Sequence, residues 1–122
     1  MLSLAVLSFT ITVLLGAVLA IQILRRPPHA PSRALAWLHG IAALISYGML
    51  LIGLRGPPRG SATGTQSFGI TAAILLLVGA AIGLLSLLLH YRRKRMPGGA
   101  IGVHASVAIF GYVILAVYLL AG

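Results

Sequence analysis

The sequence predicts an all-α integral membrane protein, a four-helix up-down bundle in which residues 1–122 form a single membrane domain. Hydrophobic residues make up 60% of the chain, charged residues only 7%, and the mean hydropathy is +1.10. These values lie outside the range of soluble domains. Four apolar runs also reach the roughly 20 residues that a helix needs to cross about 30 Å of hydrocarbon. The predicted helices cover approximately residues 2–24, 34–54, 67–90 and 99–121.

Each predicted helix has a recognisable boundary. In the first helix, residues 17–20 read "AVLA", which resembles a signal-peptide cleavage site. No basic residue precedes the apolar run, however, so we expect a retained helix. The second, third and fourth helices follow the connections "RRPPHAPSR", "RGPPRGSATGTQ" and "YRRKRMPG", which hold all six prolines. Proline ends helices at such boundaries without removing hydrogen bonds from their interiors.

The distribution of arginine and lysine predicts the orientation in the membrane. The first and third connections carry seven of the nine basic residues, and the second carries only Arg55 and Arg59. By the positive-inside rule we expect an inner (cytoplasmic) membrane protein with both termini periplasmic and the basic connections cytoplasmic. There they can meet anionic lipid head groups, so the net charge of +9 requires no nucleic-acid partner.

The residue types that the chain lacks exclude several classes of function. Without Asp or Glu there is no paired-carboxylate hydrolysis and no Ser-His-Asp triad, and proton-coupled export through an intramembrane carboxylate is disfavoured. Without cysteine there is no thiolate metal site or thiol nucleophile. The glycine-rich stretches "GLRGPPRG" and "PGGAIG" do not fit phosphate-binding loops. Metal chemistry would therefore depend on histidine.

An internal repeat relates the second and fourth predicted helices. Sliding the chain by 65 residues pairs His39 with His104 and Tyr47 with Tyr112, each tyrosine eight residues after its histidine. The same shift pairs Ala43, Leu50 and Leu54 with Ala108, Leu115 and Leu119. These offsets fall within an arc of about 80° on a helix, so each set forms one helix face. The two helical hairpins therefore look like a parallel repeat.

Small residues lie beside both histidines on these faces. They are Ala43 and Ser46 above His39, and Ala108 and Gly111 above His104. Similar stripes occur on the first helix (Ser8, Thr12, Gly16, Ala20) and on the third (Gly79, Gly83, Ser86). Such stripes allow helix backbones to approach each other in any membrane bundle, or they leave room for a flat group.

The second of these interpretations leads to a haem site. In an up-down bundle the second and fourth helices are diagonal, and His39 and His104 both lie about five residues past their helix starts, at matching depth. They can act as axial ligands to one haem iron near the cytoplasmic face, with its propionates paired to basic side chains. The candidate cofactor-binding residues are His39, His104, Arg33, Arg92, Arg93, Lys94, Ala43, Ala108, Ser46 and Gly111.

This pattern resembles the four-helix transmembrane cytochromes b, which hold haem b between histidines on alternate helices. The resemblance covers the bundle plan and implies His39 and His104 as ligands. Neither helix has a second histidine near the opposite face, so the resemblance supports at most one haem. One haem near one surface cannot carry electrons across the bilayer, so the chain would act with a partner and would not be a complete enzyme.

Other interpretations of these residues stay open. His39 and His104 can be interfacial histidines, an interpretation that the neighbouring Trp37 favours, or ligands for copper, zinc or a quinone. His90, at the end of the third helix, is a rival ligand, whereas we expect His29 in the first connection to be solvated. Tyr47 and Tyr112 can donate to a quinone carbonyl or, as we expect, to a backbone carbonyl across the bundle.

Two hypotheses for the function follow. The first is a small haem b electron-transfer protein that acts with a quinone-linked or reductase partner. The second is a cofactor-free accessory subunit of a larger membrane complex. In both, the bilayer and other membrane subunits are the expected partners, because the chain has almost no mass outside its apolar runs.

Overall fold

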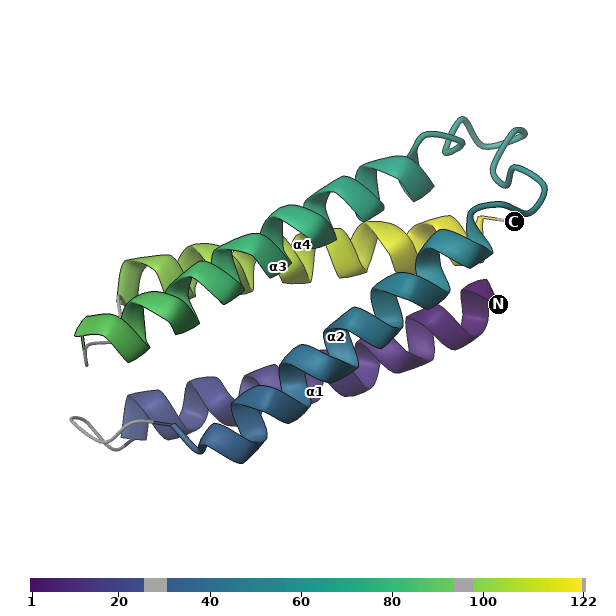
Figure 1. Ribbon diagram of the computed structural model, residues 1–122. Helices are drawn as coiled ribbons and strands as arrows, with labels where there is room; N and C mark the ends of the chain where they lie inside the picture. The colour runs from purple at the N-terminus through teal and green to yellow at the C-terminus, as the bar shows by residue number, and fades with distance from the viewer. Residues whose placement is uncertain (26–30, 94–97, 122) are drawn as a thin grey trace.

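The computed structural model describes residues 1–25, 31–93 and 98–121, and it confirms an all-α four-helix bundle (Figure 1). The helices are α1 (Leu2–Arg25), α2 (Arg33–Gly53), α3 (Phe68–Arg93) and α4 (Gly98–Leu120). All four are long and apolar enough to cross a membrane. The chain is therefore a multi-pass membrane protein.

The helix ends agree with the predicted bounds to within one residue, except at the end of α3. This helix continues three residues past its apolar run, through Tyr91 to Arg93. Hydrophobicity marks the part of a helix that lies in hydrocarbon, whereas long basic side chains can continue the same helix into the interface by reaching toward water. At the start of α2, the Ser32 hydroxyl accepts a hydrogen bond from the Leu35 amide at 3.4 Å and caps the helix.

The helices form two antiparallel hairpins, α1 with α2 and α3 with α4, which pack against each other (Figure 1). Contacts within each hairpin are more extensive than those between α1 and α4 or between α2 and α3. Among the described residues, α2 and α4 make no direct backbone approach, so they are the diagonal pair. We call the end with Met1, Ala121 and the 54–67 connection the terminal end, and the end where α2 and α4 begin the basic end.

The buried residues follow a two-fold repeat of the hairpins. On α2 and α4 the 65-residue shift relates buried Ser46 and Leu50 to buried Gly111 and Leu115. On α1 and α3 a shift of 67 residues relates the buried sets Leu2, Ala5, Phe9, Thr12 and Gly69, Ala72, Leu76, Gly79. Both hairpins therefore present equivalent faces to the bundle interior.

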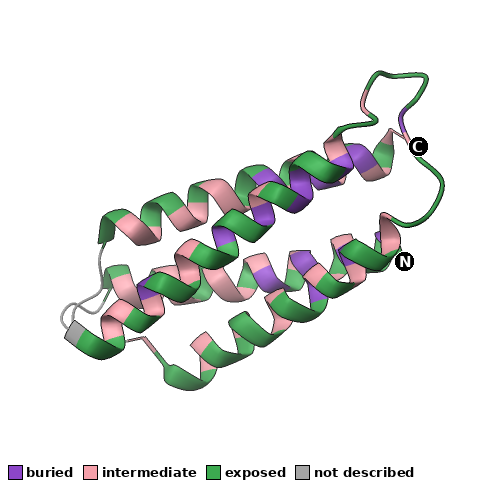
Figure 2. Cartoon of the chain, turned by 45° about the horizontal axis from the view of Figure 1, so that its top comes forward, coloured by how far each residue is buried: buried purple, intermediate pink, exposed green. Residues whose placement is uncertain are grey.

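The hydrophobic core occupies only the half of the bundle next to the terminal end. Its largest buried members are Leu2, Phe9, Leu50, Leu76, Leu115 and Tyr118. Figure 2 shows the buried segments gathered toward the N and C labels. In the half next to the basic end, Ser86 is the one buried side chain among the described residues. Hydrophobic side chains thus hold the hairpins together in one half and leave the histidine half without such a core.

We expect Leu50→Ala and Leu115→Ala each to lower the free energy of unfolding by about 2–5 kcal/mol, because each removes a side chain with no exposed surface from a packed core. Reversible unfolding in mixed micelles, followed by circular dichroism, measures this loss. Leu44→Ala is the matched control, since Leu44 lies on the same helix as Leu50 but is 74% exposed. Equal losses for Leu50→Ala and Leu44→Ala would contradict the placement of the core.

Candidate functional site

His39 on α2 and His104 on α4 meet in the centre of the bundle. Their ring centroids are 6.1 Å apart, and the ring planes are nearly perpendicular, at 89°. Both rings are only partly exposed although their helices do not approach each other directly. The structure therefore brings together, from diagonal helices, the two histidines that the sequence repeat paired.

Each histidine is hydrogen-bonded to a backbone carbonyl of the other helix in its own hairpin. His39 Nδ1 lies 2.9 Å from the Thr12 carbonyl oxygen, and His104 Nδ1 lies 2.6 Å from that of Gly79. A carbonyl oxygen only accepts, so Nδ1 must carry the hydrogen in both rings. In a neutral imidazole the other nitrogen, Nε2, then has a free lone pair that can bind a metal.

A glycine lies close to the Cε1 atom of each histidine ring. A Cβ atom placed on Gly16 would lie 3.0 Å from Cε1 of His39, and one placed on Gly83 would lie 2.7 Å from Cε1 of His104. Carbon atoms in ordinary contact are about 3.5–4.0 Å apart, so any larger residue would displace the ring. Together with its carbonyl, each glycine defines a histidine cradle: Thr12 and Gly16 for His39, Gly79 and Gly83 for His104.

The two cradles are equivalent under the two-fold repeat, and sequence reasoning did not link them to the histidines. Thr12 and Gly79 are 67 residues apart, as are Gly16 and Gly83. The histidines themselves are 65 residues apart, so no single shift of the sequence aligns the histidine, the carbonyl residue and the glycine of both cradles at once. The available signal was the four-residue spacing from Thr12 to Gly16, repeated from Gly79 to Gly83.

The small residues above the histidines make contacts inside the hairpins. A Cβ on Gly111 would lie 3.0–3.2 Å from atoms of Leu75 and Leu76, and one on Gly79 would lie 3.4 Å from Ala108. Ala43, the repeat partner of Ala108, is half-buried. These residues therefore fit the interpretation that small side chains let helix backbones approach each other.

Ser46 belongs to a hydroxyl network that, among the described residues, is found in the first hairpin and not in the second. Its hydroxyl donates to the Ala42 carbonyl at 2.7 Å and lies 2.7 Å from the Ser8 hydroxyl and 3.2 Å from the Thr12 hydroxyl. The equivalent position in the second hairpin is Gly111, which has no hydroxyl. The two histidine cradles are thus built alike, but hydroxyl groups lie next to the cradle of His39 and a glycine takes the place of Ser46 next to the cradle of His104.

Tyr47 and Tyr112 connect the two hairpins. The Tyr47 hydroxyl donates to the Ala73 carbonyl at 3.2 Å, which confirms the expected bond across the bundle. The Tyr112 hydroxyl instead lies 2.7 Å from the Thr10 hydroxyl, which itself donates to the Val6 carbonyl. Both tyrosine hydroxyls have hydrogen-bond partners within the protein, so neither needs a quinone carbonyl as a partner.

The basic residues predicted to bind propionates lie at the basic end, as far as they are described. The Arg33 guanidinium lies over the Tyr91 ring, 5.6 Å from its centroid, and thereby connects the start of α2 to the end of α3. Arg92 is exposed. The side chain of Arg93 and all of Lys94 lie outside the described residues, as does His29.

His90, the rival ligand, lies near the end of α3 and is half-buried. Its ring is 5.9 Å from the Tyr91 ring, at an angle of 47°. Its Nδ1 atom is buried and has no hydrogen-bond partner among the described residues. The ring that lies next to His39 is that of His104, whereas the ring that lies next to His90 is that of Tyr91. The structure therefore does not pair the ring of His90 with either of the other two histidines.

The donor set limits which metal groups fit. No group of three or more His, Cys, Asp or Glu side chains that could hold a metal occurs in residues 1–25, 31–93 and 98–121. Structural zinc normally needs four protein ligands, whereas haem iron needs only two axial ligands because the macrocycle supplies the rest. Two metal–nitrogen bonds of about 2 Å and two ring radii of about 1.1 Å give a centroid separation of about 6.2 Å in a linear complex, close to the 6.1 Å of this pair. The separation of the pair is therefore compatible with two axial ligands of one metal centre, and a haem would need no further protein ligand.

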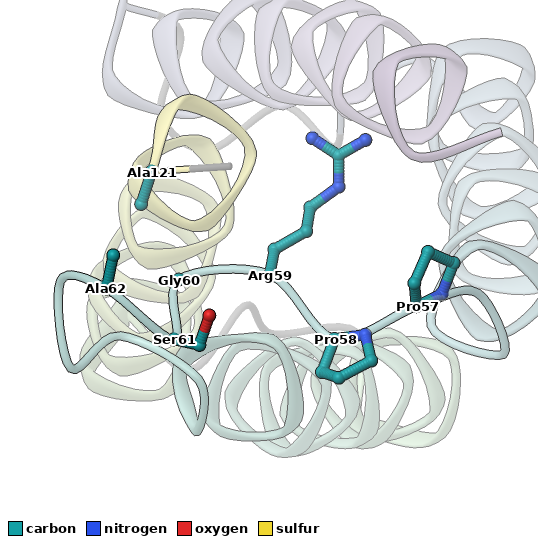
Figure 3. Close-up of a pocket in the computed structure, with 7 residues that line it drawn as sticks. All are labelled: Pro57, Pro58, Arg59, Gly60, Ser61, Ala62 and Ala121. Carbon is teal, nitrogen blue, oxygen red and sulfur yellow. The ribbon is translucent and has the colours of Figure 1, made fainter.

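A separate pocket of about 390 Å³ lies at the terminal end (Figure 3). It is lined by Pro57, Pro58, Arg59, Gly60, Ser61, Ala62 and Ala121. The Arg59 amide donates to the Tyr118 hydroxyl at 3.4 Å, and its guanidinium donates to the Leu119 carbonyl at 3.5 Å. These contacts tie the 54–67 connection to the end of α4, where a cation is favourable. The pocket is at the opposite end from the histidine pair.

The fold and the site together define a small multi-pass helical membrane protein with one half-buried histidine pair. A search of family models, curated proteins and solved structures found no match to the chain. The function is therefore argued from the site itself.

Proposed function

We propose that this chain binds one haem b between His39 and His104 and serves as an electron-transfer component of the membrane. The observation that carries the proposal is the approach of the two rings to 6.1 Å, with both Nδ1 atoms bonded to carbonyls. In both rings this hydrogen bond leaves the Nε2 lone pair free to bind a metal. The arrangement also supports a low-spin, bis-histidine iron site.

Further support comes from the packing of the histidine half. Haem is a large, flat and mostly apolar group, and it needs a region that protein side chains do not already fill. The half with His39 and His104 has no buried hydrophobic side chain among the described residues, whereas the other half has a packed core. Bound haem would supply the apolar contacts that this half lacks.

The chain's own residues would bind and orient the cofactor. Haem supplies a reversible one-electron change at its iron when it is bound. His39 and His104 provide the axial nitrogens, while the carbonyls of Thr12 and Gly79 hold the rings in place and select the ligating nitrogen. The core around Leu50 and Leu115 separates this site from the terminal end.

The site has one histidine pair, near one end of the bundle, so the chain requires a partner to pass electrons on. We propose a quinone-linked or reductase partner in the same membrane. Under the positive-inside rule the basic end faces the cytoplasm and both termini face the periplasm of a bacterial inner membrane. Arg33 and Arg92 are exposed at that end, where they can contact anionic lipids or propionates.

The test is a reduced-minus-oxidised absorption spectrum of the detergent-purified protein, expressed with haem supply, together with a pyridine haemochrome assay. We expect sharp bands of low-spin haem b at about one haem per chain. A colourless protein under haem-replete conditions would overturn the proposal. It would instead favour a cofactor-free accessory subunit, whose close helix contacts need only the small residues described above.

A further inference from the structure

The buried Nδ1 atom of His90 lacks a hydrogen-bond partner among the described residues. A polar nitrogen that is removed from water without a partner is unfavourable, so such an atom in a folded protein calls for a partner. His90 lies in the last turn of α3, and the carbonyls of the preceding turn accept hydrogen bonds within the helix. The Tyr91 ring packs beside the His90 ring, but it offers no hydrogen-bond partner to Nδ1.

His90 lies on the same face of α3 as the cradle of His104. It follows Gly83 by seven residues, a rotation that returns to within about 20° on an α-helix, and the rise between them is about 10 Å. Ser86, on this face between them, is also buried. His90 is therefore about two turns from the histidine pair in the direction of the basic end.

We infer that the His90 Nδ1–H donates a hydrogen bond to a carboxylate of the bound cofactor, a propionate of haem b. This inference rests on the proposed function. The chain has no Asp or Glu side chain that could supply a carboxylate. A haem whose iron lies between His39 and His104 carries its two carboxylates on one edge, and these are best accommodated toward the basic end, where donors and cations lie.

This role makes His90 a positioning residue instead of an iron ligand. His39 and His104 are already the proposed axial ligands, and His90 is two turns away from that pair. A hydrogen bond to a propionate would hold the haem edge at a set depth and spread the negative charge of that carboxylate. Both effects can be measured without any assay of electron transfer.

The test compares the wild-type protein with His90→Leu and His90→Asn. Leucine removes the donor, whereas asparagine carries an amide N–H at a similar distance from the backbone as Nδ1. The readouts are the rate of haem transfer to excess apomyoglobin and the midpoint potential from a redox titration. We expect His90→Leu to release haem about tenfold faster, the effect of losing one charge-assisted hydrogen bond. We also expect a lower potential, because a more negative propionate stabilises the oxidised iron, and we expect His90→Asn to restore both values.

A chemical control identifies the carboxylate. When the proteins are loaded with haem dimethyl ester, whose neutral ester oxygens are weaker acceptors than a carboxylate, the difference in release rate between wild type and His90→Leu should become much smaller. Leu88→Ala, an exposed change on the same turn of α3, should leave both readouts unchanged. Unchanged release and potential in His90→Leu, with a normal haem content, would overturn this inference and leave the proposed function standing. A wild-type protein without haem would overturn both.

Discussion

Replacing either His39 or His104 with alanine should reduce the haem content from about one per chain to near zero. Each change removes one of the two proposed axial ligands, and no third histidine lies beside the pair among the described residues to replace it. The pyridine haemochrome assay measures the loss directly. The two variants should behave alike, since the two cradles are related by the two-fold repeat.

Two controls separate loss of a ligand from loss of the fold. His29→Ala, in the first connection, should keep its haem. The variants His39→Gly and His104→Gly should regain the low-spin bands when imidazole is added, because a free imidazole can take the place of the missing side chain. Full haem content in either alanine variant would show that the pair does not ligate iron, and His90 would then be the next candidate.

Gly83→Ala should displace the His104 ring and strongly lower haem content. A Cβ at this position would lie 2.7 Å from Cε1 and 2.9 Å from Nδ1 of His104, well inside ordinary contact. The ring is fixed by its bond to the Gly79 carbonyl, so it cannot move away without losing that bond. Overpacking of this kind costs about 1–3 kcal/mol. Haem content and thermal unfolding of the apoprotein are the measurements.

The comparison among glycines tests this geometry without changing any ligand. Gly16→Ala should have the same kind of effect but a smaller one, since its Cβ would lie 3.0 Å from the His39 ring. Gly102→Ala is the control, because a Cβ there meets nothing within 4 Å. Alanine also favours the helix over glycine by up to about 1 kcal/mol, so Gly102→Ala should be neutral or stabilising. If Gly83→Ala matched Gly102→Ala, the histidine cradle would be disproved.

The hydrophobic pattern was sufficient to predict the four helices, because a membrane span requires a continuous apolar run of limited length. It did not predict that α3 extends to Arg93, since charged residues beyond the hydrocarbon leave no hydrophobic signal. The pairing of His39 with His104 was also predictable, because all the residues that repeat on these two helix faces are separated by the same 65 positions in the sequence. The structure places the two rings 6.1 Å apart, centroid to centroid.

The sequence by itself determined the number of spans, the repeat of α2 and α4, and the restriction of metal chemistry to histidine. Only the tertiary structure decided which groups surround each ring. The carbonyls of Thr12 and Gly79 and the contacts at Gly16 and Gly83 come from helices whose repeat differs by two residues from that of the histidines. Such contacts depend on how each helix is rotated and how deeply it sits against its neighbour. Those two quantities are set by the packing of small and large side chains across the whole hairpin, and no single helix carries that information in its own sequence.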